Sequence, residues 1–302
     1  MRLNKGDTIG IIALSGDCER EKVEKTRANI EALGFNVKLS KNIFDKNCYL
    51  AGSDVDKINE LHRFFEDDEI KLILCARGGY GAIRLINKID YDLIKANPKP
   101  FCGFSDVTAL LLMIYKKTGI ITYHGPMACT DFGINESPSP QPSPVGRGSC
   151  LCDETQKIFF DAINNKPLHF EGSKSLKEGF ASGVLLGGNL STVVSLCGQD
   201  FLPEENFIFF AEDLNEPVYK VDKMFQQLLN MPQFVRYCRG LILGDFLDVD
   251  NDVWLDEYFQ ELAERINIPI VSGFKITHRK DKITLPIGKR ANLEGKILQI
   301  NQ

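Results

Sequence analysis

Several residue types and patterns are scarce in this sequence, and each absence narrows the class of protein. The 302 residues include one tryptophan, four histidines and nine cysteines, and no two cysteines have the Cys-x-x-Cys spacing. Zinc ribbons and thioredoxin-type sites depend on that spacing, so the sequence suggests neither kind of site. No apolar run approaches the length of a membrane span, and residues 1–7 lack the apolar stretch of a signal peptide. We therefore expect a cytoplasmic protein without a membrane partner.

A basic cluster is also missing. The net charge is −5, and the densest basic run, at 278–282, is short and interrupted by an aspartate. An acidic chain repels phosphate backbones, so nucleic acid is not an expected partner. Hydrophobic residues make up 43% and charged residues 25% of the chain, as in ordinary globular proteins. The length suffices for two domains.

The first part of the chain alternates between short apolar runs and amphipathic segments. Such continuous apolar strands, separated by helices, indicate a parallel sheet with helices on both faces. Strands are predicted over 8–14, 36–39, 71–76, 100–104 and 120–123, and helices over 19–33, 54–65, 80–88 and 106–117. We therefore predict an α/β fold with an N-terminal parallel α/β layer domain over 1–132.

The composition changes in the middle of the chain. Residues 137–144 read Ser-Pro-Ser-Pro-Gln-Pro-Ser-Pro, a density of proline that excludes a helix or a central strand. We interpret 133–175 as a linker with a Pro/Ser-rich loop over 135–149. The remaining segment, 176–302, mixes helices with strands and ends in short strands with turns at Gly288 and Gly295, so we predict a β-rich α+β C-terminal domain.

Ser105 is the first candidate for chemistry. It follows the apolar strand at 100–104, and a helix begins directly after it. A serine on such a turn resembles a nucleophile elbow, in which backbone N–H groups of the helix start point at the attacked group. The match to Gly-x-Ser-x-Gly is incomplete, because Val107 stands at the last glycine position. The alternative is that Ser105 only caps the helix.

A glycine-rich turn, Arg77-Gly78-Gly79-Tyr80-Gly81, follows the strand at 71–76. Ligands of open α/β sheets bind at the carboxyl ends of the strands, and glycines there let backbone N–H groups approach a ligand. The spacing matches neither a dinucleotide nor a P-loop fingerprint. A tight turn without a ligand is the alternative.

A nucleophilic serine needs a base, and the base needs an orienting carboxylate. His124 closes a strand and His278 lies in a polar loop, and the residues alone leave these two histidines open as the base. Glu212 and Asp213 end the buried strand at 207–211, where an orienting carboxylate is required. The alternative is that they cap the next turn.

Five stretches together resemble the murein tetrapeptide LD-carboxypeptidase family, which includes the microcin-immunity peptidases. The resemblance covers nearly all of the chain outside the proline-rich segment. The stretches are Gly6-Asp7-Thr8-Ile9-Gly10-Ile11, Arg77-Gly78-Gly79-Tyr80-Gly81, Gly103-Phe104-Ser105-Asp106-Val107-Thr108, Leu186-Gly187-Gly188-Asn189-Leu190 and Leu285-Pro286-Ile287-Gly288.

The resemblance implies a catalytic triad, with Ser105 as nucleophile, His278 as base and Glu212 as its partner. It also implies an oxyanion hole from the backbone N–H groups of Gly79 and Asp106. No metal or organic cofactor is implied, and family members are usually homodimers. We add four candidate substrate-binding residues from the two glycine-rich stretches: Arg77, Gly78, Gly188 and Asn189.

The function implied is release of the C-terminal D-alanine from a murein tetrapeptide, whose partner is thus the peptide substrate. Two departures put the substrate in doubt: Thr277 precedes the histidine where glycine is common, and the proline-rich segment is atypical. A peptidase acting on a microcin-type antibiotic is therefore an alternative. A non-catalytic α/β ligand-binding protein is another, since Ser105 and the glycines also fit capping and turn roles.

Overall fold

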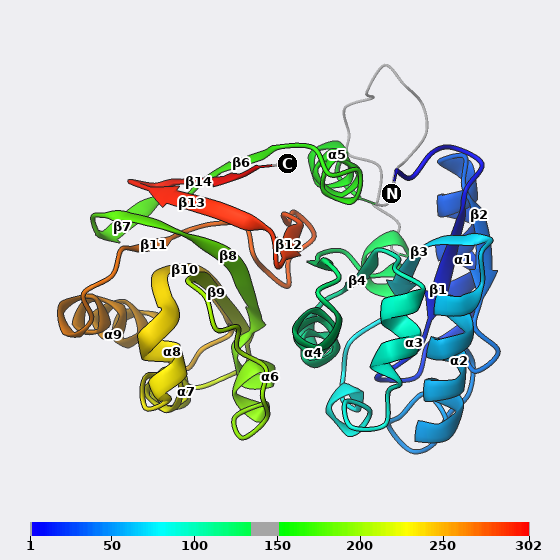
Figure 1. The fold of residues 1–302 in the computed structure, drawn as a ribbon, viewed down its shortest axis with the longest axis horizontal. Helices are drawn as coiled ribbons and strands as arrows, with labels where there is room; N and C mark the ends of the chain where they lie inside the picture. Colours follow the sequence, from blue (N-terminus) through cyan, green and yellow to red (C-terminus); the bar gives the residue numbers. More distant parts are fainter. Residues whose placement is uncertain (1, 134–150, 302) are drawn as a thin grey trace.

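Two β-sheets, built mainly from the two halves of the chain, stand side by side in the computed structural model, which describes residues 2–133 and 151–301 (Figure 1). The first sheet has the strand order β12-β5-β4-β3-β1-β2, and the second has the order β6-β14-β13-β8-β9-β10-β11-β7. This arrangement confirms the predicted α/β fold class. The proline-rich segment lies outside the described residues.

The N-terminal half forms five parallel strands with helices between them. The strands are β1 (Thr8–Ile12), β2 (Asn36–Leu39), β3 (Ile70–Cys75), β4 (Phe101–Gly103) and β5 (Thr122–His124), and the helices are α1 (Arg20–Ala32), α2 (Asp54–Glu66), α3 (Tyr91–Ala96) and α4 (Thr108–Thr118). Short turns of 3-10 helix cover Ala82–Arg84 and Ser105–Val107, and a turn of π-helix covers Ala128–Phe132.

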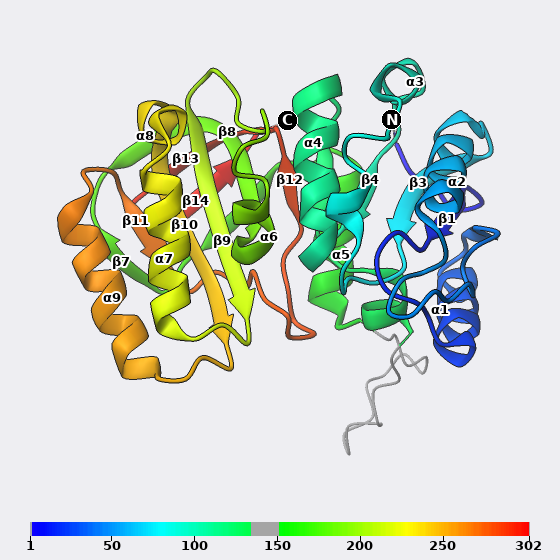
Figure 2. The same cartoon turned by 90° about the horizontal axis from the view of Figure 1, so that it is seen from below.

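Helix α4 lies between the two halves in both views (Figures 1 and 2). Every residue from Thr108 to Ile114 is buried, as expected of a helix with apolar side chains on all faces. The helix ends at Gly119, whose φ of 75° is the left-handed conformation of a C-cap. Because α4 follows Ser105 directly, this buried helix fixes the position of the serine.

The predicted helix over 80–88 is wrong. Only Ala82–Arg84 are helical, as one 3-10 turn. Gly79 and Gly81 have φ values of 121° and 134°, which no α-helix contains. The apolar spacing after Gly81 resembled a helix, but the glycines fold the chain into a turn that packs against α4.

The second sheet joins parallel strands in its middle to antiparallel strands at both ends. Its strands are β6 (Leu168–Glu171), β7 (Lys174–Lys177), β8 (Phe180–Asn189), β9 (Phe207–Leu214), β10 (Cys238–Leu247), β11 (Ile270–Ser272), β13 (Arg290–Glu294) and β14 (Ile297–Ile300). The helices are α5 (Asp153–Ile163), α6 (Leu190–Ser195), α7 (Val218–Leu229), α8 (Pro232–Tyr237) and α9 (Asp252–Arg265). Figure 2 shows α7 next to β9, with α8 above α7 and α9 on its other side. Helix α5 and strand β6 lie in the segment that we interpreted as a linker.

Strand β12 (Leu285–Ile287) belongs to the C-terminal half of the chain but joins the N-terminal sheet. It pairs antiparallel with β5, and Leu285 lies opposite His124. The chain segment before β12 carries His278. Strand β12 therefore draws that segment to the ends of the N-terminal strands, where Ser105 also lies.

No helix within residues 2–133 and 151–301 is both long and apolar enough to cross a membrane.

Candidate active site

Ser105 stands at the sharp turn between β4 and α4. Its φ is 58°, a left-handed conformation that is uncommon outside glycine. Such a conformation costs about 1–3 kcal/mol, and its presence at a strand-to-helix turn is the geometry of a nucleophile elbow. Gly103 makes room for this turn, because a Cβ atom there would lie 2.4 Å from Cγ1 of Val107. The glycine that the elbow needs therefore precedes the serine in this chain.

The glycine turn after β3 contacts the elbow directly. A Cβ atom on Gly78 would lie 2.9 Å from Cβ and 3.1 Å from Oγ of Ser105, so only glycine fits without a shift. Within residues 2–133 and 151–301, neither the N–H of Gly79 nor that of Asp106 donates a hydrogen bond. Backbone N–H groups without an internal acceptor can stabilise an oxyanion, which is the role predicted for these two residues.

The side chain of Asp106 ties the elbow to two other loops. Its Oδ2 accepts a hydrogen bond of 2.6 Å from Ser15 Oγ and one of 2.9 Å from the N–H of Ala82. The carboxylate is buried, and hydrogen bonds to a charged group are among the stronger ones. Asp106 thus holds the glycine turn and the elbow in fixed relative positions.

Glu212 and His278 face one another across the end of β9. Oε2 of Glu212 lies 2.8 Å from Nδ1 of His278. Glu212 is fully buried, and this burial raises its pKa, while His278 acts in the opposite direction. His278 keeps 19% of its side chain exposed. Since Nδ1 faces the carboxylate, Nε2 remains for a second partner.

Phe104 joins this pair to the serine. Its ring centroid lies 4.6 Å from that of His278 in an edge-to-face arrangement, and Ser105 is the next residue. Strand β4, strand β9 and the loop before β12 thus bring Ser105, Glu212 and His278 to one region. Among the described residues, no hydrogen bond joins Ser105 Oγ to His278. Catalytic hydrogen bonds are often long without substrate and tighten when it binds.

His124, the other candidate base, lies behind this pair. It is fully buried between Phe104 and Phe210, with ring centroid distances of 4.5 Å and 5.2 Å. Burial lowers the pKa of His124 to about 3, and the neighbouring His278 adds to this effect. Its Nε2 lies 3.9 Å from Oε1 of Glu212. At neutral pH His124 is therefore an uncharged imidazole that solvent does not reach.

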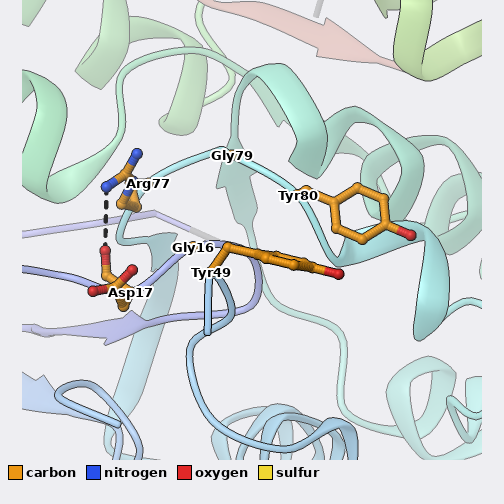
Figure 3. A pocket seen from close by; sticks show the side chains of 6 residues that line it. All are labelled: Gly16, Asp17, Tyr49, Arg77, Gly79 and Tyr80. Atoms are coloured by element: carbon orange, nitrogen blue, oxygen red, sulfur yellow. Dashed lines mark hydrogen bonds between the residues drawn. The ribbon is translucent and has the colours of Figure 1, made fainter. Parts of the chain in front are cut away.

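Arg77 lines a cavity of about 440 Å³ beside the glycine turn, together with Gly16, Asp17, Tyr49, Gly79 and Tyr80 (Figure 3). Its Nη1 donates a hydrogen bond of 3.2 Å to the carbonyl of Asp17, and its buried Nε has no partner among the described residues. The cavity shares Gly79 with the candidate oxyanion hole. The cation of Arg77 and the backbone of Gly79 therefore line one cavity.

Gly188 and Asn189 lie beside the site, but their contacts are internal. A Cβ atom on Gly188 would come within 2.4 Å of Cγ2 of Thr108, at the start of α4. Asn189 is opposite Glu212 in the sheet, caps α6 through Thr192 N at 3.2 Å, and donates a hydrogen bond of 2.9 Å to Asp213. These contacts give the two residues packing and capping roles next to Glu212.

One pair that supports the site was not predicted. Nζ of Lys282 lies 2.8 Å from Oδ1 of Asp131, and both side chains are at least 96% buried. The same ammonium lies 4.7 Å from the ring centroid of Phe104. The pair therefore anchors the loop of His278 to the N-terminal half. The charged run at 278–282 was the available signal, but its partner lies 151 positions earlier in the sequence.

No cluster of three or more His, Cys, Asp or Glu side chains in the described residues has the arrangement of a metal site.

Comparison with known proteins defines the class. Residues 9–125 match the model of the LD-carboxypeptidase N-terminal domain, and residues 182–293 match that of the C-terminal domain. The chain is 35% identical to a probable murein peptide carboxypeptidase of Bacillus subtilis, over 96% of this chain and 89% of that protein. It is 28% identical to the murein tetrapeptide carboxypeptidase of Pseudomonas aeruginosa, with coverages of 96% and 94%. These matches define a peptidase, and specifically a carboxypeptidase.

Solved structures also match this chain. The crystal structure of an MccF-like protein from Bacillus anthracis superimposes with a TM-score of 0.88 at 27% identity, covering 100% of this chain and 98% of that one. The chain belongs to the LD-carboxypeptidase family. The predicted family resemblance is thereby confirmed.

Proposed function

We propose that this protein is a serine carboxypeptidase that releases the C-terminal D-alanine of murein tetrapeptides during cell-wall peptide recycling. The observation that carries the proposal is the 2.8 Å contact between Glu212 and His278, with the imidazole packed on the residue before a left-handed Ser105. The names of the relatives from Bacillus subtilis and Pseudomonas aeruginosa support a murein peptide as substrate.

In the proposed acylation step, Ser105 Oγ attacks the carbonyl carbon of the peptide bond before D-alanine. Nε2 of His278 takes the hydroxyl proton, and Glu212 stabilises the imidazolium through Nδ1. The carbonyl oxygen becomes an oxyanion, which the N–H groups of Gly79 and Asp106 stabilise by about 3 kcal/mol each. The tetrahedral intermediate collapses, the C–N bond breaks, and His278 returns its proton to the leaving amine.

Water then repeats the sequence on the acyl-enzyme. His278 takes a proton from the water, the hydroxide oxygen adds to the ester carbon, and Ser105 leaves with the proton from His278. The shortened peptide carries a new carboxylate. Because His124 is buried and uncharged, it has no proton-transfer role in this sequence.

Recognition of the free C-terminus is assigned to Arg77. A terminal carboxylate requires a cation or backbone N–H donors, and Arg77 presents its guanidinium to the cavity that contains Gly79. We therefore expect the free tetrapeptide to be trimmed faster than its C-terminal amide or the corresponding pentapeptide. An Arg77→Gln variant should bring the rates on these three peptides closer together, because it removes the positive charge that binds the terminal carboxylate.

The test is incubation with murein tetrapeptide followed by mass analysis, with Ser105→Ala as the matched control. Loss of one alanine in the wild type, and loss of activity by about a millionfold in the variant, supports the proposal. Equal rates on tetrapeptide, amide and pentapeptide would replace it with a broader peptidase. Labelling of Ser105 by a serine-reactive phosphonate excludes a purely ligand-binding protein.

The microcin-type peptide is the second candidate substrate, since an MccF-like protein shares the fold. Parallel assays with both substrates separate the two activities. We also propose that the protein works in the cytoplasm as a homodimer, as the family resemblance implies, and size-exclusion chromatography with light scattering measures that state.

A further inference from the structure

Lys57, in the first turn of α2, is a fully buried lysine that the proposed reaction does not use. Its side chain is 0% exposed, and its Nζ has no hydrogen-bond acceptor among the described residues. A buried ammonium is rare in proteins and is normally paired with an opposite charge. Helix α2 packs on β1 and β3, and the loops that follow these two strands reach the site of Ser105. The partner of this charge therefore defines what Lys57 does.

Asp54, one helical turn before Lys57, is a nearby carboxylate, but it already has two other cations. Its Oδ1 lies 3.4 Å from Nζ of Lys57. Nε of Arg84 lies 3.1 Å from both carboxylate oxygens of Asp54, and Nζ of Lys88 lies 2.7 Å from Oδ2. Lys57 thus makes the longest of the three contacts, and without its charge Asp54 would still be neutralised by the other two. Asp54 alone therefore does not explain a buried ammonium at this position.

The ammonium of Lys57 lies next to the glycine turn. A Cβ atom on Gly81 would lie 3.3 Å from Nζ of Lys57, so the ammonium leaves little room for a side chain there. The next residue, Ala82, donates its N–H to Oδ2 of Asp106 at 2.9 Å. The ammonium and the carboxylate of Asp106 are therefore next to two consecutive residues of the same turn.

Asp106 is a buried carboxylate without a direct ion pair. It is 7% exposed, and its two hydrogen-bond donors, Ser15 Oγ and the N–H of Ala82, are both neutral. In the described part of the chain, no cation lies within ion-pair distance of it. Burial lowers the pKa of Lys57, whereas Asp54 and Asp106 act in the opposite direction. Because a buried charge needs compensation, Lys57 is a counter-charge for Asp106 across the turn.

We propose that Lys57 is a positioning residue, whose ammonium neutralises Asp106 and so holds the glycine turn against the elbow of Ser105. The proposal rests on the serine-peptidase function proposed above. Asp106 supplies one of the two N–H groups assigned to the oxyanion, and the glycine turn supplies the other, from Gly79. Such donors stabilise the transition state when their positions are fixed before the reaction. Lys57 therefore acts on kcat without touching the substrate, whereas binding of the terminal carboxylate stays with Arg77.

Lys99 offers a matched control in the same half of the molecule. It is also buried, with 6% exposed, and its Nζ donates hydrogen bonds to the carbonyls of Phe64 and Asp67. Lys99 precedes β4, whereas Ser105 follows the carboxyl end of that strand. Lys99→Met thus removes a buried ammonium of the same kind at the opposite end of the strand. Both Lys99→Met and Lys57→Met should change stability, and only Lys57→Met should change kcat.

The test measures kcat and KM for D-alanine release from murein tetrapeptide, together with urea unfolding of each variant. For Lys57→Met we expect kcat to fall by at least about tenfold, because a displacement of about 1 Å in a reacting group costs about a hundredfold. KM should stay within about twofold of the wild type, since ground-state binding is not changed. A folded Lys57→Met protein with wild-type kcat, or with a raised KM alone, would overturn the proposal.

A double-variant cycle with Asp106→Asn tests whether Asp106 is the partner. Once Asp106 has no charge to neutralise, adding Lys57→Met should change kcat by less than about twofold. Additive losses in the double variant would show that Lys57 acts elsewhere and would overturn the proposal. If Lys57→Met alone does not fold, the double variant still decides: recovered folding supports the charge pair, and persistent unfolding contradicts it.

The proposed function and the role of Lys57 fail in different ways. If the wild type cleaves no murein peptide, the proposed substrate is wrong. The rate at which a serine-reactive phosphonate labels Ser105 then replaces kcat, because the same N–H groups stabilise the phosphoryl oxygen. Labelling of Lys57→Met that is slower by at least about tenfold supports the positioning role, and equal rates overturn it. If the phosphonate does not label the wild type, both proposals fail, since no oxyanion hole then serves Ser105.

Discussion

Gly78→Ala is the sharpest test of the arrangement around Ser105. The added Cβ atom would lie 2.9 Å from Cβ of Ser105, 3.1 Å from its Oγ and 3.6 Å from the N–H nitrogen of Asp106. Carbon atoms in contact prefer about 3.5–4.0 Å. The substitution therefore acts on the proposed nucleophile and on one proposed oxyanion donor, while it leaves every titratable group in place.

The magnitude follows from these distances. The two carbon atoms must separate by about 0.6–1 Å to relieve the overlap. Overpacking of a tight site typically costs about 1–3 kcal/mol in the free energy of unfolding. A displacement of about 1 Å in a reacting group lowers the rate by about a hundredfold. We therefore expect kcat/KM to fall by about two orders of magnitude in a protein that remains folded.

The assay measures D-alanine release from murein tetrapeptide, together with urea unfolding of each variant. The control is Gly295→Ala in the β13–β14 turn, where φ is 55° and no atom lies within 4 Å of the new Cβ. That variant should lose about 1–2 kcal/mol of stability through the left-handed backbone alone and keep its activity. A folded Gly78→Ala protein whose kcat/KM stays within about threefold of wild type would refute the assigned geometry.

Three further perturbations test other parts of the site. Glu212→Gln should lower kcat by about 10⁴-fold without unfolding the protein, because the amide no longer stabilises the imidazolium of His278. A loss of kcat below tenfold in steady-state kinetics would argue against the Glu212–His278 pair. The pKa of His124 is about 3 in the folded protein and about 6.5 when unfolded, so the unfolded state binds more protons below pH 6.5 and stability falls as the pH drops. Between pH 7 and 5 the wild type should lose about 2 kcal/mol more than His124→Phe in urea unfolding, and parallel losses would show that His124 titrates normally. Lys282→Met should lower the free energy of unfolding by about 3–5 kcal/mol, because it leaves Asp131 charged and buried. Adding Asp131→Asn should recover part of this loss in thermal unfolding. A further, additive loss of stability in the double variant would contradict the ion pair.

The local features of this protein were predictable from sequence. The strand before Ser105, the helix after it and the glycine turn at 77–81 depend on residues within a few positions of one another. For the same reason, the turns at Gly288 and Gly295 were found, and both glycines have left-handed φ values. The helix predicted over 80–88 failed because the backbone freedom of Gly79 and Gly81 outweighed the apolar spacing.

Features that depend on distant contacts were not predictable. Residue types alone left His124 and His278 equivalent. They differ in the structure because His124 is buried between Phe104 and Phe210, whereas His278 packs on Phe104 and keeps 19% of its side chain exposed. The burial of Lys282 against Asp131 could not be predicted, since a lysine in a charged run is normally solvated. The family resemblance named His278 and Glu212 without reference to these contacts.

Strand β12 has a consequence for how the chain can be divided. It fills the edge of the N-terminal sheet by pairing with β5, although 160 residues separate the two strands in sequence. A fragment that ends at residue 133 would leave the backbone N–H and C=O groups of β5 open to strands from other molecules, which is the usual origin of edge-to-edge aggregation. The N-terminal sheet of this enzyme is therefore complete only after the ribosome has synthesised the C-terminal half.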